Sequence, residues 1–496
     1  MQHQCLPRVS WLALLLFLSW VLPVQAQRNK EGLAFSRCQV SMPKPALTRE
    51  LECAELELPL DYASPSSERI TLSIVRLPAQ SQQRLSDPLL MIAGGPGQSA
   101  SAALLWADKV LSKLNMRRDI YLVDQRGTGR SSALNCAAYA AQRQPSAPLS
   151  PEAAQRLAEQ CLGELHSKPR YFTTSVAVRD LEQVRVALGI TRWNVYGVSY
   201  GTRVAQHYLR RYPAAVRSLV LDGVVPPQLY LGPDVALRSE QALQTLLTRC
   251  DNDAECRRQF PELQQQTQAL FARLRREPVV QIYEDVAEVS GAERRFDADA
   301  LTGLIRMALY SDELMTLLPL QLYKAAKDGN FRALARLLDH SERTSLGINV
   351  AMHYSVLCSE DIRSEANAPV PGMQGGERYF GTDFLQQLIA TCSVWPAGVV
   401  DEDLHAPLSS DTPVLLLSGT EDPVTPPSYA EQAMQNLRNA RHLIAPGQAH
   451  AVFAEGCIPT LMAQFIDKLQ PQTLDESCLQ RLSASPFFID FNGPAP

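Results

Sequence analysis

The stretch Trp193-Asn-Val-Tyr-Gly-Val-Ser-Tyr-Gly-Thr202 contains the pattern that decides the fold. An apolar run ends at Gly197, Ser199 stands between Gly197 and Gly201, and a helical pattern follows. Flanking glycines let a serine occupy a tight turn between a strand and a helix, where larger side chains would collide. This context predicts that Ser199 is a nucleophile at a helix N-terminus, where free N–H groups stabilise negative charge. A purely structural turn is the alternative interpretation.

Several other short apolar runs end in small or acidic residues, which is typical of parallel strands buried on both faces. They span residues 89–93, 120–123, 219–221, 414–417 and 442–445. A helical period over residues 174–188 alternates with them, so the sequence predicts a doubly wound α/β domain. Between about residues 225 and 405 the alternation stops, and Leu- and Ala-rich helical patterns predict an insertion before the last two strands. Pro261 is expected at the first position of one of its helices.

A nucleophilic serine requires a base and a carboxylate that orients the base. In this class of fold the chain order is serine, acid, histidine, each after the carboxyl end of a strand. Asp422 and His450 satisfy that order and follow the last two predicted strands. The histidines rejected by position are His207, His442 and His353, and the alternative acids are Glu421 and Asp222.

The loop Gly94-Gly-Pro-Gly97 follows the strand at 89–93 and predicts the second donor of an oxyanion hole. Glycines allow the backbone to approach a ligand closely. We assign the hole to the N–H groups of Gly95 and Tyr200, with Gly94 and Gln98 as alternatives to Gly95. A phosphate-binding loop is disfavoured because no Lys-Ser/Thr pair follows.

The N-terminus predicts a cleavable signal peptide over residues 1–26. Arg8 precedes an apolar run of 14 residues, and small residues Val24 and Ala26 follow in the positions of a cleavage site. The run is short for a membrane span, so an uncleaved anchor is the less favoured alternative. We therefore expect a secreted or periplasmic protein with no membrane insertion after cleavage.

The cysteine content agrees with export. Of 11 cysteines, Cys5 lies in the predicted signal peptide, and the even remainder indicates disulfides. The sequence does not fix their connectivity; we predict that neighbours pair, and a metal loop at 250–256 is disfavoured by its ligands. The predicted pairs are Cys38–Cys53, Cys136–Cys161, Cys250–Cys256, Cys358–Cys392 and Cys457–Cys478.

The amino-acid composition excludes or disfavours other classes of protein. The chain has 496 residues, and a hydrophobic fraction of 46% excludes a disordered protein. Lys+Arg 47 against Asp+Glu 52 gives a net charge of -5, which disfavours nucleic acid as a partner.

Four motifs together resemble the α/β-hydrolase peptidases, above all the prolyl iminopeptidases and secreted tripeptidyl aminopeptidases. They lie at residues 89–97 (with GGPG), 124–131 (DQRGTGRS), 193–202 and 220–227 (VLDGVVPP). The segment 456–478 is similar to the C-terminal part of the tripeptidyl group. Ala93 stands where prolyl iminopeptidases usually have histidine, which shifts the match towards the tripeptidyl group. Arg126 is expected to be a structural ion-pair partner.

The resemblance implies an α/β-hydrolase fold with a mainly parallel sheet and an inserted helical cap. The core would comprise residues 27–224 and 406–496, and the cap residues 225–405. It also implies an exopeptidase that acts on peptides with a free N-terminus. We expect a monomer, and the predicted serine mechanism needs no metal or cofactor. Cys358-Ser-Glu-Asp361 resembles the acidic segment of this group, so Glu360 and Asp361 are candidates to bind the substrate ammonium. A solvated or salt-bridged pair is the alternative.

Fold and triad do not dictate the substrate. A carboxylesterase that acts on small apolar esters is therefore the alternative enzyme, and a hydrolase-fold binding protein is the non-catalytic alternative.

Overall fold

The computed structural model describes residues 33–41, 48–64, 66, 68–141, 149–283, 292–344, 347–362, 379–380 and 383–494. They belong to one compact unit, Leu33–Pro496. The predicted signal peptide, residues 1–26, lies outside the described residues.

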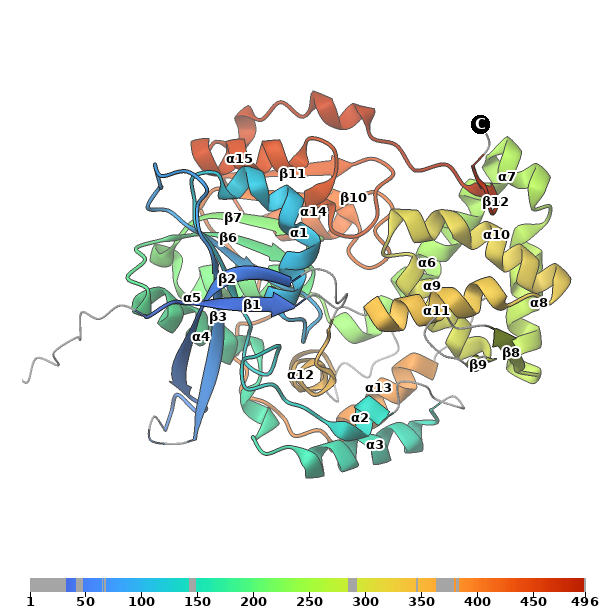
Figure 1. Cartoon of the computed structure of the whole chain (residues 1–496), viewed down its shortest axis with the longest axis horizontal. Helices are drawn as coiled ribbons and strands as arrows, with labels where there is room; N and C mark the ends of the chain where they lie inside the picture. The colour runs from blue at the N-terminus through green and yellow to red at the C-terminus, as the bar shows by residue number, and fades with distance from the viewer. Residues whose placement is uncertain are drawn as a thin grey trace, which may run out of the picture. The chain divides into compact units, whose positions relative to one another are not determined.

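A nine-stranded sheet forms the centre of this unit, with strand order β1-β2-β3-β5-β4-β6-β7-β10-β11 (Figure 1). The pairs β1–β2, β2–β3 and β3–β5 are antiparallel. All the other neighbouring strands of this sheet pair in parallel. The mainly parallel α/β architecture expected from the sequence is thus confirmed. The strands are β1 Ser36–Ser41, β2 Thr48–Pro59, β3 Arg69–Leu77, β4 Leu89–Ile92, β5 Ile120–Val123, β6 Trp193–Val198, β7 Val216–Asp222, β10 Val414–Gly419 and β11 Ala440–Ala445.

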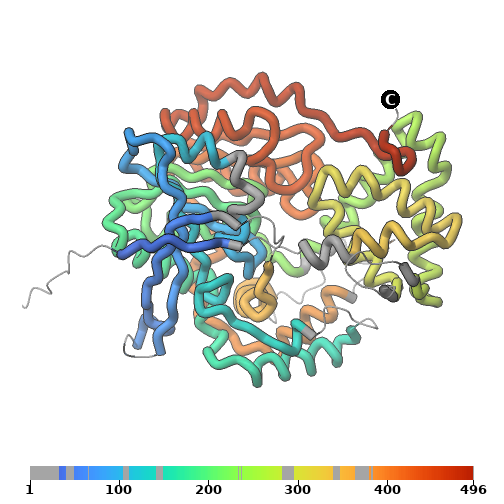
Figure 2. Tube along the Cα trace, in the orientation of Figure 1, coloured from blue at the N-terminus to red at the C-terminus, as the bar shows by residue number. Residues whose placement is uncertain are grey.

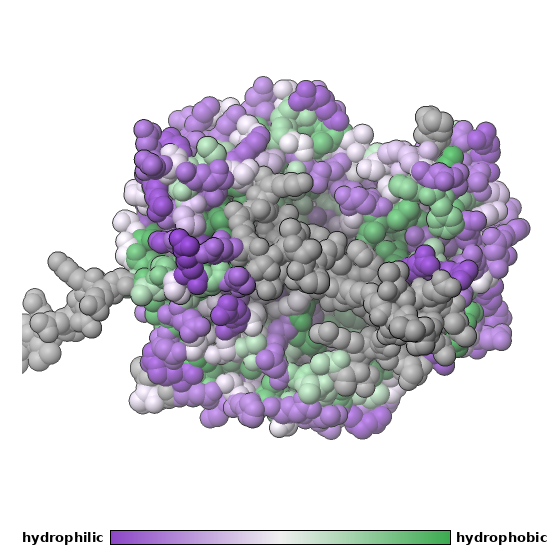
Figure 3. All heavy atoms as spheres, viewed as in Figure 1, coloured by the Kyte–Doolittle hydropathy of each residue, from purple (hydrophilic) through white to green (hydrophobic). Residues whose placement is uncertain are grey.

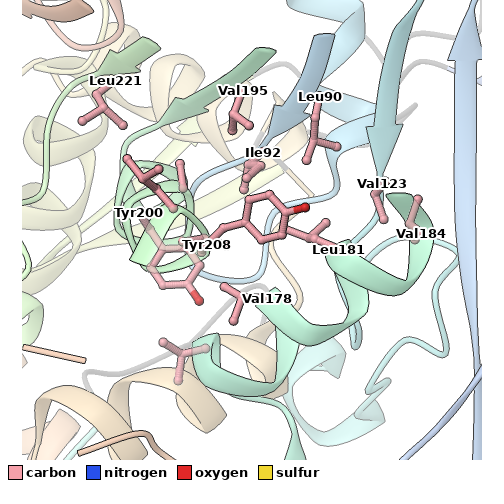
Figure 4. Close-up of a cluster of buried hydrophobic side chains, with 14 of the residues drawn as sticks. Leu90, Ile92, Val123, Val178, Leu181, Val184, Val195, Tyr200, Tyr208 and Leu221 are labelled. Carbon is pink, nitrogen blue, oxygen red and sulfur yellow. The ribbon is translucent and has the colours of Figure 1, made fainter. Parts of the chain in front are cut away.

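Helices cover both faces of the sheet because alternate residues of each strand point to opposite sides. In β4, Leu90 and Ile92 pack in one apolar cluster, whereas Leu89 and Met91 pack in another. Figure 4 shows the first cluster, in which strand side chains meet those of α4 and α5. The helices of the core are α1 Ala100–Asn115, α2 Ala137–Ala141, α3 Pro151–Glu164, α4 Thr174–Ala187, α5 Tyr200–Arg211, α14 Pro427–Met434 and α15 Ile458–Lys468.

The long insertion enters and leaves the sheet between two neighbouring strands, since β7 pairs directly with β10. The green and yellow tube in Figure 2 shows most of its helices gathered on one side of the molecule. It has its own apolar core, in which Leu243, Phe271, Leu301 and Phe331 are fully buried. Its helices are α6 Leu231–Asn252, α7 Ala254–Gln259, α8 Leu263–Arg276, α9 Ala298–Ala308, α10 Asp312–Asp328, α11 Arg332–Thr344, α12 Val350–Val356, the π-helix η3 Leu357–Asp361 and α13 Asp383–Val394.

Two details of the insertion differ from the sequence prediction. Strands β8 Val279–Tyr283 and β9 Ala292–Phe296 form an antiparallel pair that the helical patterns did not indicate. The expected helix at Pro261 begins instead at Leu263, because Glu262 before it has a left-handed backbone with φ 57°. A short pair β12 Phe488–Asp490 and β13 Gly493–Pro494 ends the described chain.

The structure joins ten cysteines in five disulfides, and these are the neighbouring pairs named from the sequence. Their Cα atoms are 4.9 to 6.3 Å apart. The bonds are Cys38–Cys53, Cys136–Cys161, Cys250–Cys256, Cys358–Cys392 and Cys457–Cys478.

Hydrophilic and apolar residues are interspersed on the face that Figure 3 shows. Large hydrophobic side chains are exposed singly, such as Phe491 (63%) and Val280 (53%). Within the described residues, none of the helices combines the length and apolar character needed to cross a membrane.

Arg126, in the loop after β5, forms a buried ion pair that ties this loop to α4. Its Nε and Nη2 donate to the two carboxylate oxygens of Asp180, each at 2.6 Å. Its Nη1 donates to the carbonyl oxygens of Leu60 and Tyr171. The structural role expected for Arg126 is therefore confirmed.

Removing one partner of a buried ion pair leaves the other charge uncompensated. We expect Arg126→Met to lower the free energy of unfolding by about 3–5 kcal/mol, measured by urea denaturation. The control is Arg438→Met, which breaks a pair with Asp411 whose side chains are 70% and 72% exposed. That change is expected to leave the free energy of unfolding nearly unchanged, because solvent screens an exposed ion pair. Equal losses in the two variants would contradict the structural role of Arg126.

Candidate active site

Ser199 occupies a strained turn between β6 and α5. Its backbone has φ 55° and ψ −129°, a conformation that residues other than glycine rarely adopt. The neighbouring glycines are sterically required: a Cβ on Gly197 would lie 2.5 Å from the Gly201 carbonyl oxygen, and one on Gly201 would lie 2.6 Å from the Ala93 carbonyl oxygen. The turn is fixed by the Ser199 N–H, which donates to the Asp222 carbonyl oxygen at 2.8 Å.

The glycine-rich loop after β4 passes directly beside this serine. An ideal Cβ on Gly94 would lie 2.9 Å from Ser199 Cβ and 3.5 Å from Ser199 Oγ. Gly95 has φ +107°, which favours glycine. Thus the segment predicted to supply an oxyanion donor lies at Ser199. The choice of Gly95 and Tyr200 as the two donors stays a prediction.

Asp422 and His450 form a buried pair after β10 and β11. His450 Nδ1 is 2.8 Å from Asp422 Oδ2. The Asp422 carboxylate also accepts hydrogen bonds from the Val424 N–H and from the N–H and hydroxyl of Thr425. An ionised carboxylate only accepts, so Nδ1 carries the proton and Nε2 keeps a lone pair for a hydroxyl proton. Thr425 is a positioning residue that the sequence analysis did not single out.

Burial and charge act in opposite directions on the pKa values of this pair. Burial alone lowers the pKa of His450, but the adjacent Asp422 carboxylate outweighs it and raises the pKa. Burial likewise raises the pKa of Asp422, yet the interaction with His450 and the hydrogen bonds from Thr425 hold it below its usual value. The arrangement therefore favours an ionised acid beside a basic imidazole.

The end of β7 links the Ser199 turn to the histidine. The Asp222 carbonyl accepts the Ser199 N–H, and the next residue, Gly223, lies against His450: a Cβ there would be 2.9 Å from His450 Cε1. The Asp222 carboxylate accepts the N–H groups of Val452 and Phe453 and so holds the chain after His450. Asp222, the last residue of β7, thus fixes the backbones of both predicted catalytic segments.

The alternative residues weighed from the sequence have other partners. Glu421 forms an ion pair with Arg249 at 2.6 Å. His207 Nε2 is 2.9 Å from Asp401, and His442 Nε2 is 2.9 Å from Ser418 Oγ. His353 Nδ1 is 3.0 Å from the carbonyl oxygen of Pro96, in the glycine-rich loop.

The insertion contacts the His450 loop through residues that no sequence motif marks. The ring of Tyr310 packs edge-on against the His450 ring at 5.1 Å between centroids. The Asp312 carboxylate accepts the Ala449 N–H at 2.8 Å, and burial raises its pKa to about 6. Only long-range packing brings these residues to the site, so sequence spacing could not have identified them.

Glu360 and Asp361 are both buried and already have partners. Glu360 accepts the N–H and hydroxyl of Thr174 at 2.6 and 2.8 Å, and burial raises its pKa to about 7. Asp361 binds Arg203 of α5 through both oxygens, at 2.9 and 3.0 Å. These contacts favour the alternative interpretation, a salt-bridged pair, and the pair is buried. Binding of the substrate ammonium by Glu360 or Asp361 stays a prediction.

In the part of the chain that the structure describes, no group of three or more His, Cys, Asp or Glu side chains could hold a metal ion. The predicted disulfide Cys250–Cys256 occupies the segment that was weighed as a metal loop.

Comparison with known proteins agrees with the fold. A family model described as alpha/beta hydrolase fold matches residues 87–456. The chain is 26% identical over 491 residues to the protein named serine protease Hip1 of Mycobacterium tuberculosis, covering 88% of this chain and 89% of the relative. It is 29% identical over 224 residues to tripeptidyl aminopeptidase of Streptomyces coelicolor, covering 41% and 40%. It is 26% identical over 475 residues to carboxylesterase B of M. tuberculosis, covering 89% of each.

The close approach of Gly94 to Ser199 gives a direct test of the loop. We expect Gly94→Ala to slow the reaction of Ser199 with a fluorophosphonate probe about 100-fold, because the new methyl displaces the loop or the hydroxyl. The control is Gly163→Ala, since a Cβ on Gly163 meets nothing within 4 Å. Unchanged labelling of the Gly94 variant would contradict the assigned geometry.

Proposed function

The chain belongs to the alpha/beta hydrolase fold family and is a serine hydrolase, and we propose that it is an exported aminopeptidase. The observation that carries the proposal is the Asp422–His450 pair, with 2.8 Å between Oδ2 and Nδ1. His450 lies against Gly223, which directly follows Asp222, the residue of β7 that holds the Ser199 turn. Substrate would be a peptide with a free N-terminus.

In the proposed mechanism, His450 Nε2 takes the Ser199 hydroxyl proton as Oγ attacks the scissile carbonyl. The Asp422 carboxylate fixes the tautomer of the neutral imidazole and stabilises the imidazolium that forms. N–H groups of Tyr200 and Gly95 would hold the oxyanion. His450 then gives the proton to the leaving amine. Water next attacks the acyl-enzyme while His450 takes its proton, and His450 returns that proton to Ser199 Oγ as the acyl group leaves.

The peptidase assignment is supported by the relatives named serine protease Hip1 and tripeptidyl aminopeptidase. Export is supported by the sequence of residues 1–26 and by the five disulfides, which persist in oxidising compartments.

An esterase is the second candidate, because carboxylesterase B covers as much of the chain as Hip1 at the same identity.

Glu360, with Asp361 second, is proposed to bind the substrate ammonium, in competition with the anchoring contacts described above. Glu360→Gln separates the two roles. Ammonium binding predicts a higher KM for peptides with a free N-terminus but not for esters, whereas anchoring alone predicts a lower free energy of unfolding without that selectivity.

The bond cleaved can be found by mass spectrometry of a peptide mixture incubated with the mature protein. We expect short N-terminal fragments to be released, and release to cease with Ser199→Ala. N-blocked copies of the same peptides should resist cleavage. Equal cleavage of blocked peptides, or turnover of esters alone, would contradict the aminopeptidase proposal.

Asp422→Asn tests the acid and gives a pH signature. A protonated His450 cannot accept the serine proton, so kcat/KM falls as the pH drops through the pKa of His450. Asp422 raises that pKa, so its neutralisation should move the acid limb to lower pH. We expect kcat to fall about 10⁴-fold as well. An acid limb that does not move would contradict the role of Asp422.

A further inference from the structure

Arg306, in α9 of the insertion, is a partly buried cation. Its Nε is inaccessible to solvent and has no hydrogen-bond partner. Among the described residues, no carboxylate lies within ion-pair distance of its guanidinium, which instead stacks 4.3 Å from the ring of Phe384. Burial lowers the pKa of Arg306. By contrast, the buried Arg126 and Arg203 each bind a carboxylate directly.

Arg306 interacts with two residues that contact the predicted catalytic segments. Tyr310, four residues further on, packs against the His450 ring; burial raises the pKa of Tyr310 to about 12, and the charge of Arg306 opposes that rise. On the other side, burial lowers the pKa of His353 and the charge of Arg306 lowers it further. His353 in turn contacts the Pro96 carbonyl of the glycine-rich loop. Arg306 is thus next to residues that touch both the base and the oxyanion loop.

A solvent-inaccessible N–H group without a hydrogen-bond partner is costly, and a guanidinium matches a carboxylate with two parallel hydrogen bonds. We propose that Arg306 binds a carboxylate of the substrate and makes the enzyme selective for peptides with an anionic group near the scissile bond. This inference rests on the proposed peptidase function. The carboxylate has two possible sources: the C-terminus of a short peptide, or an Asp or Glu side chain.

Two matched peptide pairs distinguish these sources. One pair differs only in a C-terminal carboxylate or amide, and the other has Glu or Gln after the cleaved bond and a C-terminal amide. We expect the wild-type enzyme to prefer the anionic member of at least one pair about 10- to 100-fold in kcat/KM, as a charged hydrogen-bonded contact would give. The pair that shows the preference identifies the source.

Arg306→Gln should abolish that preference by slowing only the anionic peptide, whereas Arg306→Lys should retain part of it. Arg332→Gln, at an exposed arginine of the same insertion, is the matched control and should leave the preference intact. Dissociation constants of the anionic peptide for Ser199→Ala and Ser199→Ala/Arg306→Gln give a readout without turnover, and the double variant should bind about 10- to 100-fold more weakly.

Equal kcat/KM within both pairs for the wild-type enzyme would overturn the inference and leave the aminopeptidase intact. A preference that survives in Arg306→Gln would also overturn it. Cleavage of no peptide, with esters still hydrolysed, would instead overturn the peptidase function and this inference with it.

Discussion

The strained backbone of Ser199 is the constraint on which the rest of the site depends. A non-glycine residue in such a conformation costs about 1–3 kcal/mol and persists only where its surroundings fix it. Here the close packing of Gly197 and Gly201 and the hydrogen bond to the Asp222 carbonyl do so. The same packing brings the glycine-rich loop against the serine. Any change that relaxes the turn would therefore disturb nucleophile and loop together.

The insertion contacts the core at two places in the candidate active site. Asp361 binds Arg203 on the helix that follows Ser199, while Tyr310 and Asp312 contact the loop that carries His450. The segments that carry Ser199 and His450 are thereby both supported by one inserted segment. This explains why acidic residues that resemble a ligand-binding motif in sequence are buried in ion pairs.

Local sequence patterns made many strands of this structure predictable. Contacts between segments distant in the sequence could not be predicted. Strands such as β4 and β10 were predictable because each is apolar throughout and buried on both faces. The positions of Asp422 and His450 followed from chain order and strand ends. The pair β8–β9, the contact of Tyr310 with His450 and the unpaired state of Arg306 arise from packing between distant segments. Periodicity and spacing contain no information about such contacts, nor about the burial of Glu360.

Because β7 and β10 are hydrogen-bonded neighbours, the whole insertion leaves and rejoins the sheet at a single gap between two strands. The strand order does not depend on what is inserted there. Evolution, or a protein engineer, can therefore exchange the inserted segment as a module while the sheet is kept, provided that the replacement supplies new supports for α5 and for the His450 loop.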